Sequence, residues 1–377
     1  MAKNRKLEMI ATQPDSPLQA IRTALKASLK ERDHVIDAVM TGVLAQENVF
    51  LLGPPGTAKS LSVELFAKAI GGNYFFALMG KTTTPDELFG PVKISALRED
   101  RLERNMENKL PTAHLGFLDE VFKASSAVLN ATLTLMNERT YVNGGKAFKT
   151  PVMSIFGASN ELPQAEELAA LYDRFALRVL VDRIQDEDNF EALLSGGMNT
   201  QIPTITLQEL AQDQKLASEV TMPPALISMI VGLRHAVHQE GMYVSDRKWM
   251  QSVRIVKAYA HLNGRSEAIV DDLEILESVL WSTPDQMRSI RRLISRTTNP
   301  VGEQIVKVTD GVQELMDQVK AMPDDEKRVQ FAQQVQAKVR SGRQQLEKLG
   351  DPASNPKLKA AIDKLLKQSA SLQEMCM

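Results

Sequence analysis

The stretch LLGPPGTAKS, residues 51–60, constrains the fold of this chain more than any other feature. An apolar run over Val49–Leu52 stops at Gly-Pro-Pro-Gly, and a helical pattern then continues from Lys59 to about Ile70. A short apolar run that ends at such a turn is typical of a strand buried on both faces, as in a parallel sheet. The sequence therefore predicts a strand, a glycine-containing loop and a helix in direct succession.

The same alternation continues along the first half of the chain. A helix is expected over residues 17–46, before the first strand, and helical stretches separate the later apolar runs. Alternating strands and helices predict an α/β fold, a parallel sheet between layers of helices. The further strand candidates are Tyr74–Leu78, Leu115–Leu118, Met153–Phe156 and Leu177–Val181.

From about residue 200 the strand candidates stop. Residues 205–283 are expected to form a small helical domain, one helix of which begins at Pro223–Pro224. After residue 284 three further helices are expected, the first with an apolar seam from Ile305 to Met322 and an end at Pro323. They predict an arm that packs on itself, with docking or oligomerisation as the alternative. The expected domains are 1–200, 201–283 and 284–377.

Composition excludes several classes of protein. The only cysteine is Cys376, which rules out a disulfide framework within one chain and fits a reducing compartment. The N-terminus lacks the apolar run of a signal peptide, and no apolar stretch is long enough to cross a membrane. A net charge of −2 makes a nucleic-acid partner unlikely. The chain is therefore expected in the cytoplasm.

The loop after the first strand has the features of a phosphate-binding loop. Gly53 and Gly56 supply a turn whose backbone N–H groups surround phosphate oxygens at a helix N-terminus. Lys59 would reach the β- and γ-phosphates of ATP, and Ser60 would bind Mg²⁺. The residues expected to contact the nucleotide are Gly53, Pro54, Pro55, Gly56, Thr57, Ala58, Lys59, Ser60 and Leu61. A plain strand-to-helix turn is the alternative, and Lys-Ser at the required spacing argues against it.

Ala58 stands where the strict motif has glycine. It lies about where the helix begins, so we expect it to adopt the right-handed helical conformation, which alanine tolerates well. ATP binding should then survive the substitution.

Two more strand ends carry polar side chains. LGFLDE, residues 115–120, places Asp119 and Glu120 at the carboxyl end of a buried strand, the edge at which open α/β sheets bind ligands. Asp119 would hold Mg²⁺, and Glu120 would polarise the attacking water. Asn160, in FGASNE, follows the next strand and could orient that water, although a turn residue is the simpler interpretation by itself.

These motifs together resemble the MoxR family of AAA+ ATPases, and most closely its RavA-like branch. The likeness covers about residues 29–281, with TTTPDELFGP, ASSAVLNATLTLMNER, ASNELP, ALYDRF and YVSDRKW in order. It implies a homo-hexameric ring with ATP sites between subunits. In that ring Arg174 would be the arginine finger that enters the neighbour's site, and Arg247 a sensor that touches the γ-phosphate of its own subunit. Without the resemblance, Arg174 would be assigned a salt bridge with Asp173 or Glu161.

Two hairpins are also expected, the first from the resemblance and the second from its turn residues. Residues 89–110 are similar to the hairpin inserted in helix 2 of this clade, with PVKISAL and RLERN as its strands, and residues 139–151 form a second hairpin that turns at Asn143-Gly144-Gly145. In related rings such hairpins face the pore; plain surface hairpins are the alternative. The resemblance makes residues 201–283 the helical lid domain of the ATPase. RavA-like proteins carry a β-containing insert after this lid, whereas here only helices are expected after residue 284.

The sequence therefore predicts an ATP hydrolase with a chaperone-like task, the remodelling, maturation or activation of a client protein together with a von Willebrand factor A-domain protein. Two alternatives stay open. A nucleic-acid-translocating motor would need a basic pore hairpin, and residues 89–110 carry nearly balanced charge. A low-turnover nucleotide switch or scaffold is harder to reconcile with intact Lys59, Asp119 and Glu120.

Overall fold

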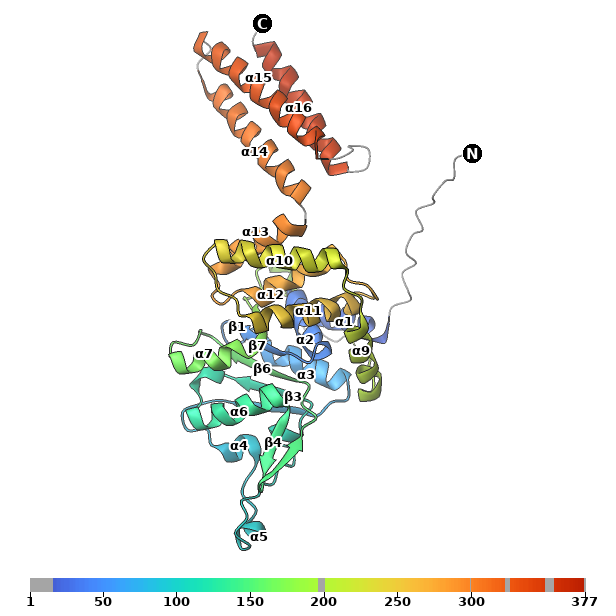
Figure 1. Cartoon of the computed structure of the whole chain (residues 1–377), viewed down its shortest axis with the longest axis vertical. Helices are drawn as coiled ribbons and strands as arrows, with labels where there is room; N and C mark the ends of the chain where they lie inside the picture. Colours follow the sequence, from blue (N-terminus) through green and yellow to red (C-terminus); the bar gives the residue numbers. More distant parts are fainter. Residues whose placement is uncertain (1–15, 196–200, 299, 323–325, 350–355, 376–377) are drawn as a thin grey trace, which may run out of the picture. The chain divides into compact units, whose positions relative to one another are not determined.

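Five parallel strands form the central sheet in the order β2-β3-β6-β1-β7 (Figure 1). Each predicted strand is present, and β1 and β6 are buried at every position because helices cover both faces. In register, Leu52 pairs with Ser159 and Leu118 with Gly157, so β1, β6 and β3 end at the same edge of the sheet. The strands are β1 (Asn48–Leu52), β2 (Tyr74–Leu78), β3 (Leu115–Asp119), β6 (Ser154–Ser159) and β7 (Phe175–Leu180).

The computed structural model describes residues 16–195, 201–298, 300–322, 326–349 and 356–375. They form two units, one up to Ile290 and one from Arg291 onward. No helix in these ranges is long and apolar enough to span a membrane. The helices of the α/β part are α1 (Pro17–Ser28), α2 (Asp33–Leu44), α3 (Lys59–Ala69), α6 (Ser126–Glu138), α7 (Glu166–Asp173) and α8 (Glu187–Leu194).

The predicted single helix over residues 17–46 is wrong. It is two helices, α1 and α2, because Glu31 adopts a left-handed conformation with φ 57° and breaks the helical path. α2 packs against β1 and β7, and α3 packs against β2 and β3. The break places residues 29–32 beside the phosphate-binding loop.

The predicted two-stranded hairpin within residues 89–110 is also wrong. One isolated bridge, Val92 to Arg104, joins its two sides, and the segment between them contains the short helix α5 (Ile94–Leu97). Asp100, at φ 53°, reverses the chain after α5, so the apolar ISAL run forms a helical turn instead of a strand. α4 (Pro85–Phe89) and η1 (Leu110–Thr112) flank the segment.

The second predicted hairpin is confirmed as β4 (Thr140–Asn143) and β5 (Lys146–Lys149). Gly144 and Gly145 have φ of 58° and 74°, which glycine adopts without strain in such a turn. The Asn143 side chain accepts the Arg104 N–H at 2.7 Å and donates to the Arg104 carbonyl at 3.0 Å. The two inserted segments are therefore hydrogen-bonded to each other and form one projection.

The helical domain after residue 200 agrees with the prediction. It contains α9 (Leu207–Glu219), α10 (Pro224–Gln239), α11 (Asp246–Leu262), η3 (Val270–Leu276) and α12 (Glu277–Leu280). α10 begins at Pro224, as expected for a proline in a first turn. α11 packs against α2, α9 and η3, so its position is fixed from several sides.

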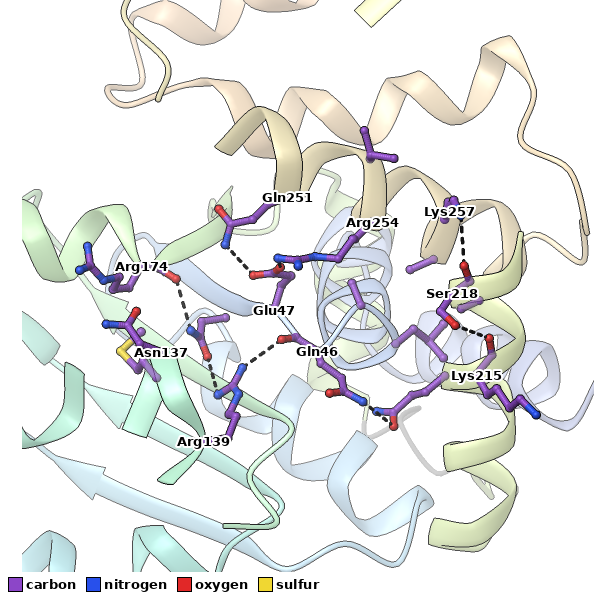
Figure 2. Close-up of a pocket in the computed structure, with 18 of the residues that line it drawn as sticks. Gln46, Glu47, Asn137, Arg139, Arg174, Lys215, Ser218, Gln251, Arg254 and Lys257 are labelled. Carbon is purple, nitrogen blue, oxygen red and sulfur yellow. Dashed lines mark hydrogen bonds and ion pairs between the residues drawn. The ribbon is translucent and has the colours of Figure 1, made fainter. Parts of the chain in front are cut away.

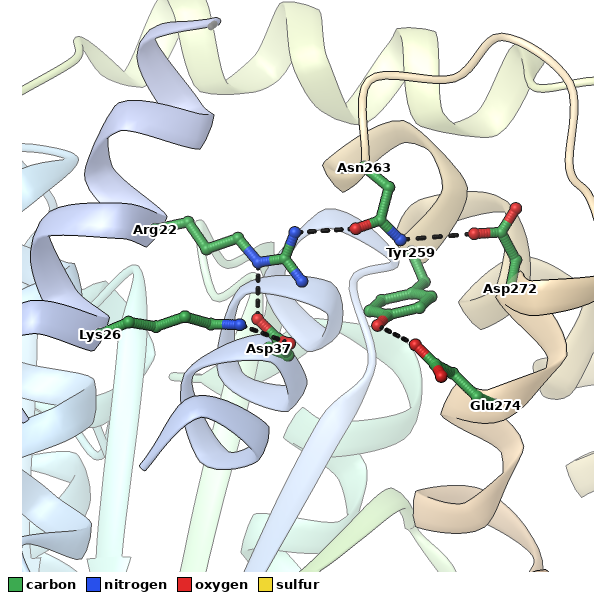
Figure 3. A network of polar contacts seen from close by, with 7 residues as sticks. All are labelled: Arg22, Lys26, Asp37, Tyr259, Asn263, Asp272 and Glu274. Carbon is green, nitrogen blue, oxygen red and sulfur yellow. Dashed lines mark hydrogen bonds and ion pairs between the residues drawn. The ribbon is translucent and has the colours of Figure 1, made fainter. Parts of the chain in front are cut away.

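A polar network joins the first two helices to this domain. The Arg22 guanidinium donates to Asp37 at 2.6 Å and to the Asn263 side chain at 2.8 Å, and Asn263 donates in turn to the fully buried Asp272 at 3.3 Å. Helices α1, α2, α11 and η3 are thus held by side chains as well as by apolar packing. Figure 3 shows the members Arg22, Lys26, Asp37, Tyr259, Asn263, Asp272 and Glu274.

The second unit is a helical bundle, as predicted. α14 (Pro300–Ala321), α15 (Glu326–Glu347) and α16 (Pro356–Met375) surround an apolar core, and α13 (Gln286–Thr298) spans the boundary between the units. Ile305, Val312 and Val319 of the predicted seam lie in this core, together with Leu365 and Leu372. The three helices therefore bury their own apolar stripes.

Candidate nucleotide-binding site

The loop between β1 and α3 has the form that a phosphate site requires. α3 begins at Lys59, and Gly56 turns the loop with φ 77° at a place where an added Cβ would meet no atom within 4 Å. Gly53 acts differently from the prediction: a Cβ there would lie 2.1 Å from the Val181 carbonyl oxygen, so glycine permits close packing against the end of β7.

The conformation expected for Ala58 is wrong. Its φ and ψ are 63° and 25°, the left-handed region, so the residue caps α3 from outside the helix instead of beginning it. The neighbouring Thr57 is buried and its hydroxyl donates to the Pro54 carbonyl at 2.9 Å. The loop therefore imposes at position 58 the backbone shape that the strict motif supplies with glycine.

This conformation makes a stability prediction. The free energy of unfolding of an Ala58→Gly variant should be up to ~1 kcal/mol higher than that of the natural chain. The left-handed conformation costs alanine ~1–2 kcal/mol and glycine nothing, and the greater entropy of glycine in the unfolded chain offsets part of this gain. Ala236→Gly, within α10, is the control and should lower stability by about 1 kcal/mol. Chemical denaturation measures both, and equal losses would contradict the left-handed assignment.

Lys59 lies among the carbonyl oxygens of its own loop. Its ammonium donates to the carbonyls of Gly53 and Pro54, each at 2.7 Å. Burial lowers the pKa of Lys59, while the negative charges of Asp119 and Glu120 act in the opposite direction. The structure therefore brings the loop lysine and the two predicted carboxylates into one electrostatic environment.

Asp119 and Glu120 lie at the end of β3, as predicted. The Asp119 carboxylate accepts the Glu120 N–H at 3.0 Å, and Glu120 has a left-handed backbone with φ 52°, a conformation found at functional sites. Oε2 of Glu120 is buried and lies 3.2 Å from the Lys123 ammonium without the geometry of a hydrogen bond. The position of Glu120 is therefore fixed by its backbone conformation and backbone hydrogen bond more than by contacts of its side chain.

The oxygen ligands here suit Mg²⁺. This ion is commonly held by one or two protein oxygens, waters and substrate phosphates, and Ser60 and Asp119 offer a hydroxyl and a carboxylate at the ends of neighbouring elements. Within the described ranges no three His, Cys, Asp or Glu side chains converge as a metal site.

Asn160 and the phosphate loop are neighbours. Asn160 is exposed directly after β6, and the carbonyl of the preceding Ser159 accepts the Gly53 N–H at 3.0 Å. The loop, the acidic pair and Asn160 thus follow three adjacent strands at one edge of the sheet, where ligands bind in this class of fold.

The sequence analysis did not identify Arg32, a buried residue that is hydrogen-bonded to the phosphate-binding loop. Arg32 is 4% exposed, and its guanidinium donates to the Thr57 carbonyl at 3.0 Å and to the Asp182 carbonyl at 2.7 Å. Beside it, the Glu31 carboxylate accepts the backbone N–H groups of Gln185 and Asp186. A break between α1 and α2 would have drawn attention to residues 29–32, but the apolar spacing continues across it and predicted a single helix.

Arg174 and Arg247 lie away from this loop. Arg174 directly precedes β7, and its carbonyl accepts from Asn48, the first residue of β1. It therefore lies at the opposite edge of the sheet from the loop, the length of a strand away, or about 15 Å. Arg247, in the first turn of α11, lines the same cavity as Arg174, and its charge, after burial, lowers the pKa of Arg174.

This arrangement differs from the expected contact between Arg247 and the γ-phosphate of its own subunit. The packing of α11 on α2 and α9 directs its first turn to the amino edge of the sheet, away from Lys59. Arg174 also lacks the strong internal salt bridge considered above, because its closest approach to Asp173 is 4.0 Å and its buried Nε has no hydrogen-bond partner. One nitrogen of Arg174 donates to the Ala170 carbonyl at 3.2 Å, which leaves its other N–H groups for a ligand at the edge opposite the loop, the edge that Arg247 also lines.

The order of the strands, the phosphate loop, the acidic pair and the helical lid define a P-loop nucleotide-binding protein of the AAA+ class. Residues 16–220 match the model of the MoxR domain of MoxR–vWA–β-propeller ternary systems, and residues 225–294 match an AAA lid domain. The chain belongs to the MoxR family of AAA+ ATPases.

Relatives and a solved structure agree with this assignment. An uncharacterized protein of Methanocaldococcus jannaschii is 41% identical over 80% of this chain and 80% of its own length. Chaperone MoxR1 of Mycobacterium tuberculosis is 25% identical over 68% of this chain and 72% of its own. The crystal structure of a candidate ATPase from Cytophaga hutchinsonii superposes with a TM-score of 0.62 at 18% identity, over 74% of this chain and 94% of that one, which shows the shared fold.

Proposed function

We propose that the chain hydrolyses ATP at sites formed between two copies of itself in a head-to-tail ring. One observation carries the proposal: Arg174 and Arg247 lie at the edge of the sheet opposite Lys59, Asp119 and Glu120. One chain therefore cannot bring both groups to one phosphate. A repeated head-to-tail contact brings the loop edge of one copy to the arginine edge of the next, and such contacts form a ring when the rotation between copies closes.

Each residue then has a role in hydrolysis. Lys59 and the loop N–H groups orient the phosphates, Glu120 takes a proton from the attacking water, and Asn160 orients that water. Arg174 and Arg247 from the adjacent copy stabilise the charge on the transferred phosphoryl group. Mg²⁺, held by Ser60 and Asp119, would neutralise phosphate charge when bound. The expected ring is a hexamer, as in the MoxR resemblance.

Protein remodelling is the task that the exposed projection favours. Ile94, Leu97 and Leu102 are 71%, 55% and 63% exposed, and Val142 of the adjoining hairpin is 59% exposed. Exposed apolar side chains in one projection suit contact with a polypeptide. The matched family model names von Willebrand A and β-propeller partners, so we propose a protein with a von Willebrand A domain as partner in the cytoplasm.

The motor alternative receives less support. In the projection Arg101 pairs with Glu99 and Glu103, and Arg104 pairs with Asp86, so these cations are neutralised locally. A channel that follows a nucleic-acid backbone needs unpaired positive charge. We propose from the sequence motifs that the chain belongs to the RavA-like branch of the family. It has a helical bundle where RavA-like proteins carry the β-containing insert.

Ring formation is tested by the mass of the particle in solution. The Glu120→Gln variant at saturating ATP should give a particle six times the mass of one chain in light scattering, because ATP fills the contact between copies. Lys59→Ala is the control that should not respond to ATP. A single-chain mass for Glu120→Gln at tens of micromolar protein would contradict the composite site.

A further inference from the structure

The cavity that contains Arg174 and Arg247 is strongly cationic. It has a volume of about 1090 Å³ and lies between the amino edge of the sheet, α9 and α11. Figure 2 shows Arg174, Arg139 and Arg254 among the side chains around it, with Lys215 on α9 and Lys257 on α11. Among the described residues that line it, Glu47 is the only acid, against Arg139, Arg174, Lys215, Arg247, Arg254 and Lys257.

The single acid is already neutralised. The Glu47 side chain is 7% exposed, and its carboxylate accepts from the Gln251 amide at 2.7 Å and from the Arg254 guanidinium. Of the other cations, Arg174 and Lys215 reach carboxylates only outside the lining, those of Asp173 and Glu219, and each only at 4.0 Å. A concave surface with this excess of positive charge suits a polyanion rather than a second acidic side chain.

Arg254 links the acid to the cavity. Its side chain is 61% exposed, and among the described contacts one of its nitrogens donates, to Glu47. A guanidinium has five N–H donors, so most remain for a ligand in the cavity. Arg247 and Arg254 are seven residues apart on α11, which places them on one face of the helix about 10 Å apart.

We infer that Arg254 is a third cation of the composite ATP site. It would contact the phosphates of the nucleotide held by the loop of the adjacent copy, and it would leave Glu47 to do so. This inference rests on the proposed function, because the phosphates come from a second copy of this chain. It adds a residue outside the motifs that carry the family resemblance.

The exchange of partners gives Arg254 a second effect. Glu47 lies directly before β1, the strand that ends at the loop, whereas Gln251 and Arg254 belong to lid helix α11. When Arg254 leaves Glu47, one of the two side-chain links between the start of β1 and α11 is lost. Phosphate bound at the neighbouring copy would thereby loosen the lid of this one.

Mixing two impaired variants tests the inference. Arg254→Ala subunits keep an intact loop but should lose about tenfold in ATPase rate, as expected for one charge-assisted hydrogen bond. Lys59→Ala subunits should bind ATP far more weakly but bring an intact Arg254. In a random equal mixture about one junction in four joins an intact loop to an intact arginine, so the rate should rise above the sum of the separate rates.

Two further variants separate the possible failures. Arg174→Ala mixed with Lys59→Ala calibrates the assay: no rescue there contradicts the composite site itself. Rescue of Arg174→Ala without rescue of Arg254→Ala contradicts only the role of Arg254. Arg234→Ala, a similarly exposed arginine on α10, should keep the natural rate.

Glu47→Gln distinguishes phosphate binding from a merely structural link. It removes the charge that holds Arg254 but keeps an oxygen for Gln251, so its ATPase rate should stay well above that of Arg254→Ala. Equal losses in the two variants would assign Arg254 to the link alone and overturn the inference. Thermal unfolding of each variant shows whether a lost rate reflects a lost fold.

Discussion

A Glu120→Gln variant is expected to bind ATP as tightly as the natural chain and to hydrolyse it ~10²–10⁴-fold more slowly. Glutamine has the size and shape of glutamate, so the left-handed backbone at position 120 and the N–H bond to Asp119 should persist. What is lost is the base that accepts a proton from water. Steady-state phosphate release measures the rate, and a fluorescent ATP analogue measures the affinity.

Lys59→Ala is the matched control for this experiment. Unlike Glu120→Gln, it should lose affinity for ATP, on the order of 100-fold, because its contact to the phosphates is missing. Equal steady-state rates for Glu120→Gln and the natural chain would remove Glu120 from catalysis and favour the low-turnover switch. Glu120→Gln locked with ATP should also retain clients from lysate. Selective retention of a protein with a von Willebrand A domain supports remodelling, and salt-resistant nucleic acid supports the motor.

An Arg174→Ala variant should lose ~10³–10⁵-fold in the rate of hydrolysis, the usual contribution of an arginine finger. ATP affinity should change little, since Arg174 lies at the other edge of the sheet from the loop of its own chain. The same two assays give rate and affinity, and Arg234→Ala controls for the loss of a surface arginine.

The distinguishing result is the dependence on a second copy. Arg174→Ala protein should recover hydrolysis when it is mixed with Lys59→Ala protein, which supplies the arginine. A variant that hydrolyses ATP at the natural rate, or that loses affinity as strongly as Lys59→Ala, would show that Arg174 has another role.

The sequence predicted the sheet, and the positions of the residues in one half of the candidate site, for a local reason. Each strand is a short apolar run, and the residues predicted for this half lie at the carboxyl ends of such runs: Asp119 ends β3, Glu120 and Asn160 follow β3 and β6 directly, and Lys59 follows β1 after the loop. Parallel strands with a common register bring these ends together. Little beyond strand order is needed to place them.

The other half depends on packing that local patterns do not contain. The position of Arg247 is set by how α11 lies on α2 and α9, and the Glu47–Arg254 contact joins residues 207 positions apart. Ala58 and Glu31 illustrate the same limit for the backbone. Both favour right-handed conformations by themselves, and their surroundings hold them in left-handed ones.

Lys59 has a consequence for selectivity. Because its ammonium is already bound by the carbonyls of Gly53 and Pro54, any incoming anion competes with a ligand that is covalently part of the site. A single orthophosphate offers few contacts in return for this displacement, whereas the chain of phosphates in ATP can meet the lysine and the loop N–H groups at once. We therefore expect this loop to bind a chain of phosphates in preference to a single small anion.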